Sequence, residues 1–248
     1  MLNQMKKFKK IDAHSHVGNF EGWPDVRITP EELIGQMDEY NIEKTVLSTF
    51  PIEESLRAVE RYPDRLIGAA WVNPLEGEKA ISEIRNSVEK CGFKAIKLHP
   101  LFQAYRANDD CVFPIAELAE ELNVPLMIHS GHAPFSLPWS IAQLAERYPK
   151  VKVVMIHMGH GHGVYIQAAL DMAEKYDNIY LETSGMPMQN KIKEAYEKVG
   201  SDRVLFGIDA PFHHPSVEIQ RSMVSGLTDA QLEDLFYNNA AKLLGISL

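Results

Sequence analysis

Short apolar runs alternate with amphipathic stretches along this chain of 248 residues. The apolar runs have the length and composition of buried strands, at 9–18, 43–50, 65–74, 93–100, 124–131, 151–159, 178–185 and 203–212. Each is followed by a stretch of helical periodicity, at 29–41, 52–63, 76–92, 111–123, 136–149, 162–176, 189–200 and 214–226. A further amphipathic helix is expected at 228–246. Thr29 and Pro30 have the residue types that cap and start the first of these helices.

Eight strand–helix units in strict alternation predict a parallel sheet, and units of this length predict a single (β/α)8 TIM barrel with an extra C-terminal helix. No low-complexity linker interrupts the series, so one domain is expected over residues 1–248. A doubly wound open sheet is the alternative. The absence of a glycine-rich fingerprint after the first strand argues against it.

The composition, with 45% hydrophobic and 24% charged residues, is that of a soluble globular protein, and the net charge of −9 argues against a general nucleic-acid binder. Cys91 and Cys111 indicate reduced thiols in a cytoplasmic protein rather than a disulfide framework. No signal peptide is visible, and no apolar run approaches the roughly 18 residues of a membrane span. The expected partners are therefore a small-molecule substrate and a second copy of the chain in a homodimer, with neither nucleic acid nor membrane.

The histidines are segregated along the chain. All ten lie at the C-terminal end of a predicted strand, in the loop after it or at the first position of the next helical stretch: His14, His16, His99, His129, His132, His157, His160, His162, His213 and His214. In a barrel these strand ends meet on the face that carries active sites. Asp12, His14 and His16 occupy alternate positions, so a regular strand would place all three on one face.

Alternation along the other strands predicts which side chains face the barrel axis. The inward set is Lys97, His99, His129, His157 and Asp209. Val154 and Ile156 are expected to face the helices. Neutral imidazoles and a carboxylate suit Zn²⁺ and related divalent ions, so the inward set predicts a metal centre. A hydrogen-bonded polar barrel mouth without metal is the alternative.

Several motifs resemble the amidohydrolase superfamily, and in particular its amidohydrolase-related branch of decarboxylases and lactonases. They are "DAHSHVG", "KAIKLHPLFQ", "MIHSG", "VVMIHMGH" and "LFGIDAPF", in that order along the chain, with "LEDLFYNNAAKLLGI" at its close. The likeness runs from about residue 10 to residue 246. The chain is short for the decarboxylase branch, whose specificity insertions it lacks.

The resemblance implies roles for particular residues. His14, His16, His129 and Asp209 would be metal ligands, with Asp209 also moving a proton and His157 orienting water or polarising the substrate. One Zn²⁺ ion is the expected cofactor.

Lys97 fits a site with one metal ion poorly, because a buried ammonium beside a cation needs a partner. An ion pair with Glu182 is the favoured solution. A neutral amine is the second, and a carbamate on Lys97 that bridges two metal ions is the third.

Four further residues are candidates for contact with the substrate. Arg106 could bind a carboxylate through its guanidinium fork, although a surface arginine is equally consistent with the sequence. Trp23 could form a wall of the pocket or pack under its loop, and His132 and His160 could contact substrate or support the ligands. The remaining loop histidines are expected to be solvated: His162, His213 and His214.

These residues lead to three hypotheses for function. The first is a metal-dependent hydrolase that cleaves an ester, lactone or amide in a small molecule, with or without a carboxylate, with a metal-activated water attacking while Asp209 takes a proton. The alternative is a metal-dependent non-oxidative decarboxylase, in which Asp209 or His157 protonates carbon. A metal-binding barrel without turnover is the third. The residues themselves do not separate the first two.

Overall fold

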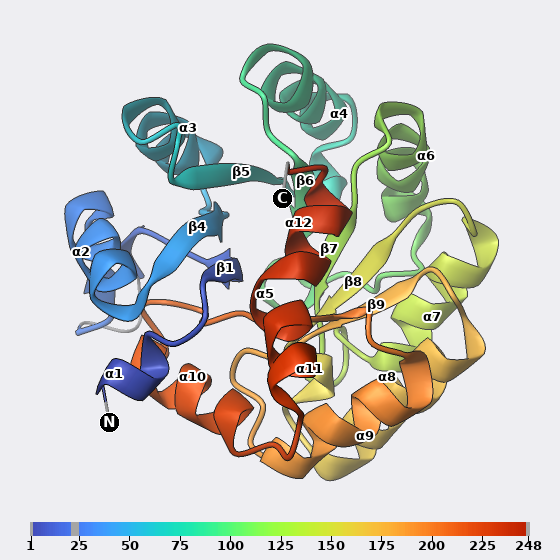
Figure 1. The fold of residues 1–248 in the computed structure, drawn as a ribbon. Helices are drawn as coiled ribbons and strands as arrows, with labels where there is room; N and C mark the ends of the chain where they lie inside the picture. The colour runs from blue at the N-terminus through green and yellow to red at the C-terminus, as the bar shows by residue number, and fades with distance from the viewer. Residues whose placement is uncertain (1, 21–24, 247–248) are drawn as a thin grey trace.

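The computed structural model describes residues 2–20 and 25–246, and its main feature is an eight-stranded parallel sheet rolled into a barrel (Figure 1). Its strands are β1 (Lys10–Ser15), β4 (Ile42–Leu47), β5 (Leu66–Trp71), β6 (Ala95–Leu98), β7 (Leu126–His129), β8 (Val153–Ile156), β9 (Ile179–Glu182) and β10 (Val204–Leu205). Each strand pairs with the next of these along the chain.

Backbone hydrogen bonds between β1 and the segment after β10 bring the two ends of the sheet together. The amide of Ala13 donates to the carbonyl of Phe206 at 2.9 Å, and the amide of Asp209 donates to the carbonyl of His14 at 2.6 Å. The predicted (β/α)8 barrel is confirmed.

Helices surround the strands on the outside (Figure 1). They are α2 (Pro30–Tyr40), α3 (Ile52–Arg61), α4 (Glu78–Arg85), α6 (Phe113–Leu122), α7 (Pro138–Arg147), α8 (Gly163–Lys175), α9 (Gln189–Val199) and α10 (Pro215–Met223). Thr29 caps α2 in a capping box with Glu32, and Pro30 starts the helix, as the sequence predicts.

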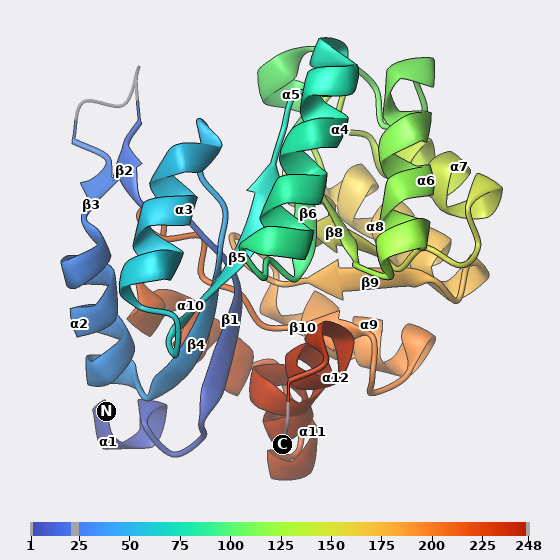
Figure 2. The same cartoon turned by 90° about the horizontal axis from the view of Figure 1, so that it is seen from above.

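The expected C-terminal helix is also present, as α11 (Asp229–Glu233), a π-helical turn at Asp234–Asn238 and α12 (Asn239–Leu244). It crosses one end of the barrel (Figure 1). Four short elements are not predicted from the sequence: α1 (Leu2–Met5), β2 (Gly18–Asn19), β3 (Arg27–Ile28) and α5 (Pro100–Gln103). The β2–β3 hairpin and α5 lie at the end of the barrel opposite α11 and α12 (Figure 2).

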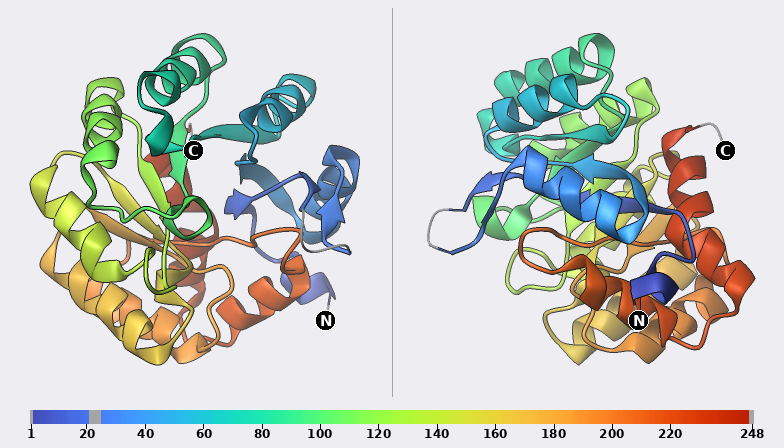
Figure 3. Two further views of the ribbon diagram at one scale, coloured as in Figure 1. Left: turned by 180° about the vertical axis from the view of Figure 1, so that it is seen from behind. Right: turned by 60° about the vertical axis from the view of Figure 1, so that its left-hand side comes forward.

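The apolar core has two parts. The larger lies between strands and helices, and the smaller fills the barrel interior, where Ala95, Met127 and Leu205 meet Ala240 and Leu244 of α12. Because α12 closes this end, the site must form at the other end, which Figure 3 shows from behind in its left-hand view.

The predicted orientation of β8 is wrong. Val154 and Ile156 belong to the inner cluster, whereas Val153 and Met155 pack toward the helices. His157 nevertheless lies in the site, because its φ of 70° is left-handed and breaks the alternation at the strand end.

Two expectations from the composition can be compared with the fold. None of the described helices is long and apolar enough to cross a membrane. Cys91 and Cys111 are both free, as expected of reduced thiols.

Candidate metal centre

The C-terminal end of β1 and the segment after β10 bring two histidines and an aspartate together at the open end of the barrel. Nε2 of His16 lies 3.2 Å from Oδ1 of Asp209, and Nε2 of His14 lies 3.5 Å from the same oxygen. The potential ligand atoms of His14, His157 and Asp209 all lie within 4.8 Å of one another. All four side chains are at most 10% exposed.

The pairing of β1 with β4 is irregular around His14. The register with β4 shifts between Asp12 and Ser15, so the regular alternation that the sequence suggests does not hold there. Asp12 does not join the histidines. Its carboxylate accepts hydrogen bonds from the amides of His14 and Ile208 and from the hydroxyl of Ser15. It therefore ties β1 to the end of β10.

Hydrogen bonds at Nδ1 hold the imidazole rings of His16 and His157 and leave Nε2 of each ring available to the site. Nδ1 of His16 contacts the carbonyl oxygen of Ser48, which can only accept a proton. Nδ1 of His157 lies 3.0 Å from the carbonyl oxygen of Ser184. Both rings therefore donate from Nδ1 and turn the lone pair of Nε2 toward the site, which is how the surroundings of a metal ligand usually orient it.

The site favours neutral imidazoles. Burial lowers the pKa of His14 and of His157 well below the ordinary value, and neighbouring cationic groups, including Lys97, lower it further. Burial likewise lowers the pKa of His129. Neutral nitrogen lone pairs facing a carboxylate oxygen repel one another unless a cation lies between them, so the donor set fits a divalent metal ion.

Lys97, on β6, lies next to this group. Its Nζ is 3.5 Å from Nε2 of His14, and burial lowers its pKa to about 7. The predicted ion pair with Glu182 is wrong: among the described residues the two side chains form none. The Glu182 carboxylate instead accepts hydrogen bonds from the amides of His157 and Ser184 and from the Ser184 hydroxyl.

A second group of histidines adjoins the first. The potential ligand atoms of His129, His132 and His160 all lie within 4.8 Å of one another. His160 stacks on His157, with 4.3 Å between ring centroids. His129 is predicted to be a ligand together with His14 and His16, and its Nε2 lies 3.1 Å from Nδ1 of His132. The structure thus divides the predicted residues between two adjacent groups.

Aromatic rings border these histidines. We call five of them the aromatic collar: Phe20, Phe50, Trp71, Phe102 and Phe212. Trp71 is buried and stacks on His99, with 5.4 Å between ring centroids. The rings of Phe20 and Phe212 lie 5.7 and 6.1 Å from that of His16. The sequence does not single out the collar, because its members come from separate loops and strand ends.

The other residues that the sequence singles out are Arg106, Trp23, His162 and His214, and their positions differ. Arg106 is exposed, and its Nε lies 3.6 Å from Oδ1 of Asp109, so its guanidinium contacts its own loop. Trp23 lies outside the described residues. His162 and His214 accept backbone hydrogen bonds at the starts of α8 and α10, at exposed positions.

His213 differs from the prediction that it is solvated. Its side chain is two-thirds buried, with Nε2 3.9 Å from Oδ2 of Asp209 and Nδ1 3.7 Å from the buried carboxylate of Glu218. Loops lack the periodicity that would have signalled this placement.

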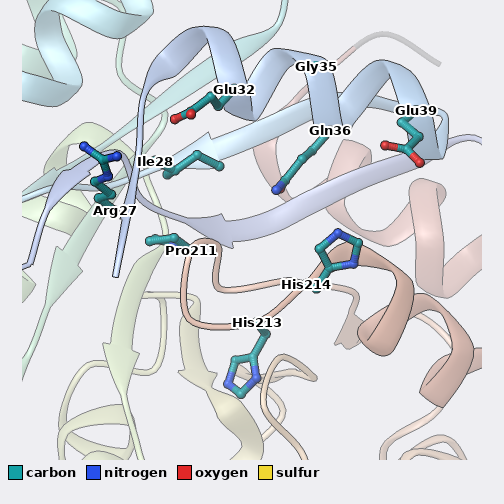
Figure 4. Close-up of a pocket in the computed structure, with 9 residues that line it drawn as sticks. All are labelled: Arg27, Ile28, Glu32, Gly35, Gln36, Glu39, Pro211, His213 and His214. Carbon is teal, nitrogen blue, oxygen red and sulfur yellow. The ribbon is translucent and has the colours of Figure 1, made fainter. Parts of the chain in front are cut away.

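His213 also lines a cavity of about 600 Å³ between α2 and the loop after β10. Figure 4 shows this cavity, with Arg27, Glu32 and Glu39 on one side and Pro211 and His213 on the other. The cavity thus adjoins the metal centre through a residue that contacts both.

Comparison with known proteins gives consistent results. The model of the amidohydrolase family matches residues 11–246. Gamma-resorcylate decarboxylase of Polaromonas sp. is 23% identical, over 91% of each chain. The solved 5-carboxyvanillate decarboxylase of Novosphingobium aromaticivorans, in complex with manganese and a nitrobenzoic acid, has a TM-score of 0.79 and 18% identity, over 97% of each chain. A dihydroxybenzoic acid decarboxylase of Polaromonas sp., with bound manganese and 2-nitroresorcinol, has a TM-score of 0.75 and 19% identity, over 96% of this chain and 97% of its own.

These relatives correct the predicted chemistry. The hydrolase prediction is wrong, because the relatives are decarboxylases of aromatic acids. Zinc also finds no support, since the two solved decarboxylases described above hold manganese. The cause is physical: one set of imidazole and carboxylate ligands can serve either water attack or protonation of carbon, so the ligands alone do not distinguish the two reactions.

The fold, the order of the histidine motifs and the match over residues 11–246 agree. This chain belongs to the amidohydrolase family.

Proposed function

We propose that this protein is a metal-dependent, non-oxidative decarboxylase of a small aromatic carboxylic acid. The observation that carries the proposal is the combination of a carboxylate, Asp209, and neutral imidazoles with the aromatic collar beside them. The decarboxylase relatives support the reaction, and their named substrates support an aromatic acid.

His14, His16 and Asp209 would hold one divalent transition-metal ion, with His157 facing the same point. The chemistry of the donor set supports this assignment, because its lone pairs converge and the hydrogen bonds of His16 and His157 leave Nε2 available. When bound, the ion would hold the substrate's carboxylate and offset its negative charge.

The residues of the chain supply the proton. Asp209, with His157 beside it, would protonate the ring carbon that carries the carboxylate. The bond from that carbon to the carboxylate then breaks, and its electron pair returns to the ring as carbon dioxide leaves. Asp209 regains a proton from solvent. The net reaction consumes one proton and needs no oxidant or reductant.

The aromatic collar would hold the substrate's ring and exclude water. Trp71 is 6% exposed and lies over His99, so a ring bound against it would lie between the histidines and the exposed phenylalanines. Offset and edge-to-face contacts between aromatic rings contribute about 0.5–1.5 kcal/mol each beyond their buried area. Such contacts select flat substrates over aliphatic ones.

The test is a direct assay of bond cleavage. The protein, loaded with Mn²⁺, is incubated with 2,6-dihydroxybenzoate and 5-carboxyvanillate, the acids named for the relatives. We expect carbon dioxide and the corresponding arene in equal amounts, and a reaction in D₂O should place one deuterium on the carbon that carried the carboxylate. The Asp209→Asn variant is the control. A panel of hydroxylated benzoates that yields no carbon dioxide would contradict the proposal.

Three further expectations stay predictions: a single domain, a cytoplasmic location and a homodimer. The last is checked by light scattering of the purified chain.

A further inference from the structure

Lys10, the first residue of β1, is completely buried at the end of the barrel opposite the metal centre. Its ammonium donates to three main-chain carbonyl oxygens, those of Met5 at 2.6 Å, Phe8 at 2.7 Å and Tyr40 at 2.9 Å. Nζ also lies 5.4 Å from the centroid of the Phe236 ring. An ammonium has three N–H donors and no acceptor, so the three carbonyls satisfy it completely. We call these carbonyls and the ring the ammonium cage.

The cage takes the place of a carboxylate partner. In the part of the chain that the structure describes, Lys10 forms no ion pair, and burial alone lowers its pKa, to about 8. The amine therefore keeps its proton at neutral pH. A buried charge is costly unless hydrogen bonds replace its water, and the carbonyl of Tyr40, at the C-terminus of α2, carries the negative end of the helix dipole.

The cage joins two separate parts of the chain. Two of its carbonyls belong to residues 2–9, which we call the N-terminal strap, and the third belongs to α2. The strap includes α1, which lies beside α10 (Figure 1). The side-chain amide of Asn41 adds hydrogen bonds to the carbonyls of Lys6 at 3.0 Å and Phe8 at 3.1 Å.

We propose that the Lys10 ammonium, bound in this cage, holds the N-terminal strap on the barrel, and that the strap opens as a local unit when the ammonium is absent. Hydrogen bonds from a charged donor are about twice as strong as neutral ones, and two of the three from Lys10 end on the strap. Short terminal segments are poorly ordered unless such contacts hold them.

The ion pairs of the strap are weaker candidates for this role. Lys7 pairs with Asp229 and Lys9 with Glu43, and all four side chains are at least 37% exposed. Exposed pairs contribute little to stability. Burial of apolar side chains such as Phe8 also holds the strap, so the test must separate charge from packing.

The strap covers the place where the sheet closes. The ring of Phe8 stacks on that of Phe236 at 5.7 Å, and Phe236 packs against Phe206 at 4.9 Å. The amide of Phe206 donates to the carbonyl of Leu235, and its carbonyl accepts from Ala13 of β1. Opening of the strap would therefore uncover the contact between the two ends of the sheet. The proposal concerns this end of the barrel alone and does not depend on the proposed decarboxylation.

The experiment is limited proteolysis of the full chain by trypsin at neutral pH, with the fragments identified by mass spectrometry. Trypsin can cleave the strap after Lys6, Lys7 and Lys9. Lys10→Met removes the charge and keeps most of the apolar stem, and it should raise the rate of cleavage in the strap by about 10–100-fold while the barrel stays resistant. Lys44→Met is the matched control and should leave the rate unchanged, since Lys44 also donates to a main-chain carbonyl, but outside the cage.

A second variant, Lys10→Ala, tests the cage by chemical rescue. It leaves a space for n-propylammonium, which should slow cleavage of the strap again, whereas the neutral n-propanol should not. Lys10→Met has no such space, so it should show no rescue and controls for inhibition of trypsin.

Three results would overturn the proposal. Cleavage of Lys10→Met at the wild-type rate would mean that packing alone holds the strap. No rescue of Lys10→Ala by n-propylammonium, or an equal effect of n-propanol, would mean that the cage does not select a charge. Cleavage throughout the barrel at the same rate would mean that the strap does not open as a local unit.

Discussion

Nε2 of His16, which directly follows the first strand of the barrel, lies 3.2 Å from Oδ1 of Asp209, which follows the last strand. The other nitrogen of the same ring contacts the carbonyl oxygen of Ser48 beyond β4. One imidazole thus joins three parts of the sheet at the point where the proposed chemistry occurs. Its placement makes Asp209 the first residue to test.

We expect Asp209→Asn to lower kcat by on the order of 10²–10⁴-fold, because asparagine cannot carry the proton at neutral pH. The fold should survive, since Asp209 has a φ of +62° and asparagine tolerates this left-handed conformation as well as aspartate does. Steady-state kinetics and a circular dichroism melt measure the two effects. Turnover equal to that of the wild type would remove Asp209 from the mechanism.

The aromatic collar gives a second prediction, about substrate binding rather than chemistry. Phe102 is 67% exposed and its ring lies 6.0 Å from that of Trp71. Phe102→Ala should raise KM for an aromatic acid by about 3–10-fold and leave kcat within about twofold, because the lost contact is made equally in ground and transition states. Val224→Ala, at a residue 55% exposed and next to α10, is the matched control. Equal KM values for both variants would argue against a role for the collar.

The loop that holds Gly131, after β7, packs closely against the backbone at Gly159, after β8, and this contact predicts a large difference between two glycine substitutions. Gly131→Ala forces a Cβ atom to within 2.4 Å of backbone at a positive φ, and should cost about 2–4 kcal/mol of unfolding free energy. Gly35→Ala, in α2 with no atom within 4 Å of the added methyl, should gain about 0.5–1 kcal/mol. Chemical denaturation measures both. Similar stabilities for the two variants would show that the loops can move apart without cost.

Lys97 gives a prediction about pH. Its pKa falls from 10.5 to about 7 on folding, mainly because of burial. Between pH 7 and pH 10.5 the Lys97 amine is protonated in the unfolded chain but not in the folded chain. The free energy of unfolding therefore rises as pH rises through this range and falls as pH falls toward 7. For metal-free protein, Lys97→Met should therefore be more stable than the wild type by about 2–5 kcal/mol at pH 6, with a smaller advantage at pH 9. Denaturant titrations at the two pH values test this, and an advantage that grows with pH would contradict it.

The barrel could be predicted because its strands and helices repeat, so that errors at single residues do not change the pattern. The site was predicted less well where the backbone departs from regular geometry. The register of β1 shifts between Asp12 and Ser15, where Asp12 does not join the histidines, and the left-handed backbone of His157 turns its side chain into the site from a strand of the opposite phase. Neither departure has a signature in hydrophobic periodicity.

His213 and the collar were missed for a related reason. They lie on loops and strand ends, where contact depends on where several segments meet rather than on any local pattern. The sequence His-x-Gly-His, at 129–132 and again at 157–160, is a visible signal that histidines gather at the ends of β7 and β8. Its meaning depends on knowing that β7 and β8 are neighbours.

The closure of the sheet has a consequence for synthesis of the chain on the ribosome. His14 and His16 are synthesised early, whereas Asp209, which lies beside both, follows β10. The amide of Ala13 likewise has its acceptor, the carbonyl of Phe206, only after β10 has been synthesised. A nascent chain that ends before residue 206 therefore has a row of strands with an unpaired β1 edge and only part of its metal ligands. Such edges invite association with other chains. Loading of the metal and protection of β1 must both follow translation of the last strand.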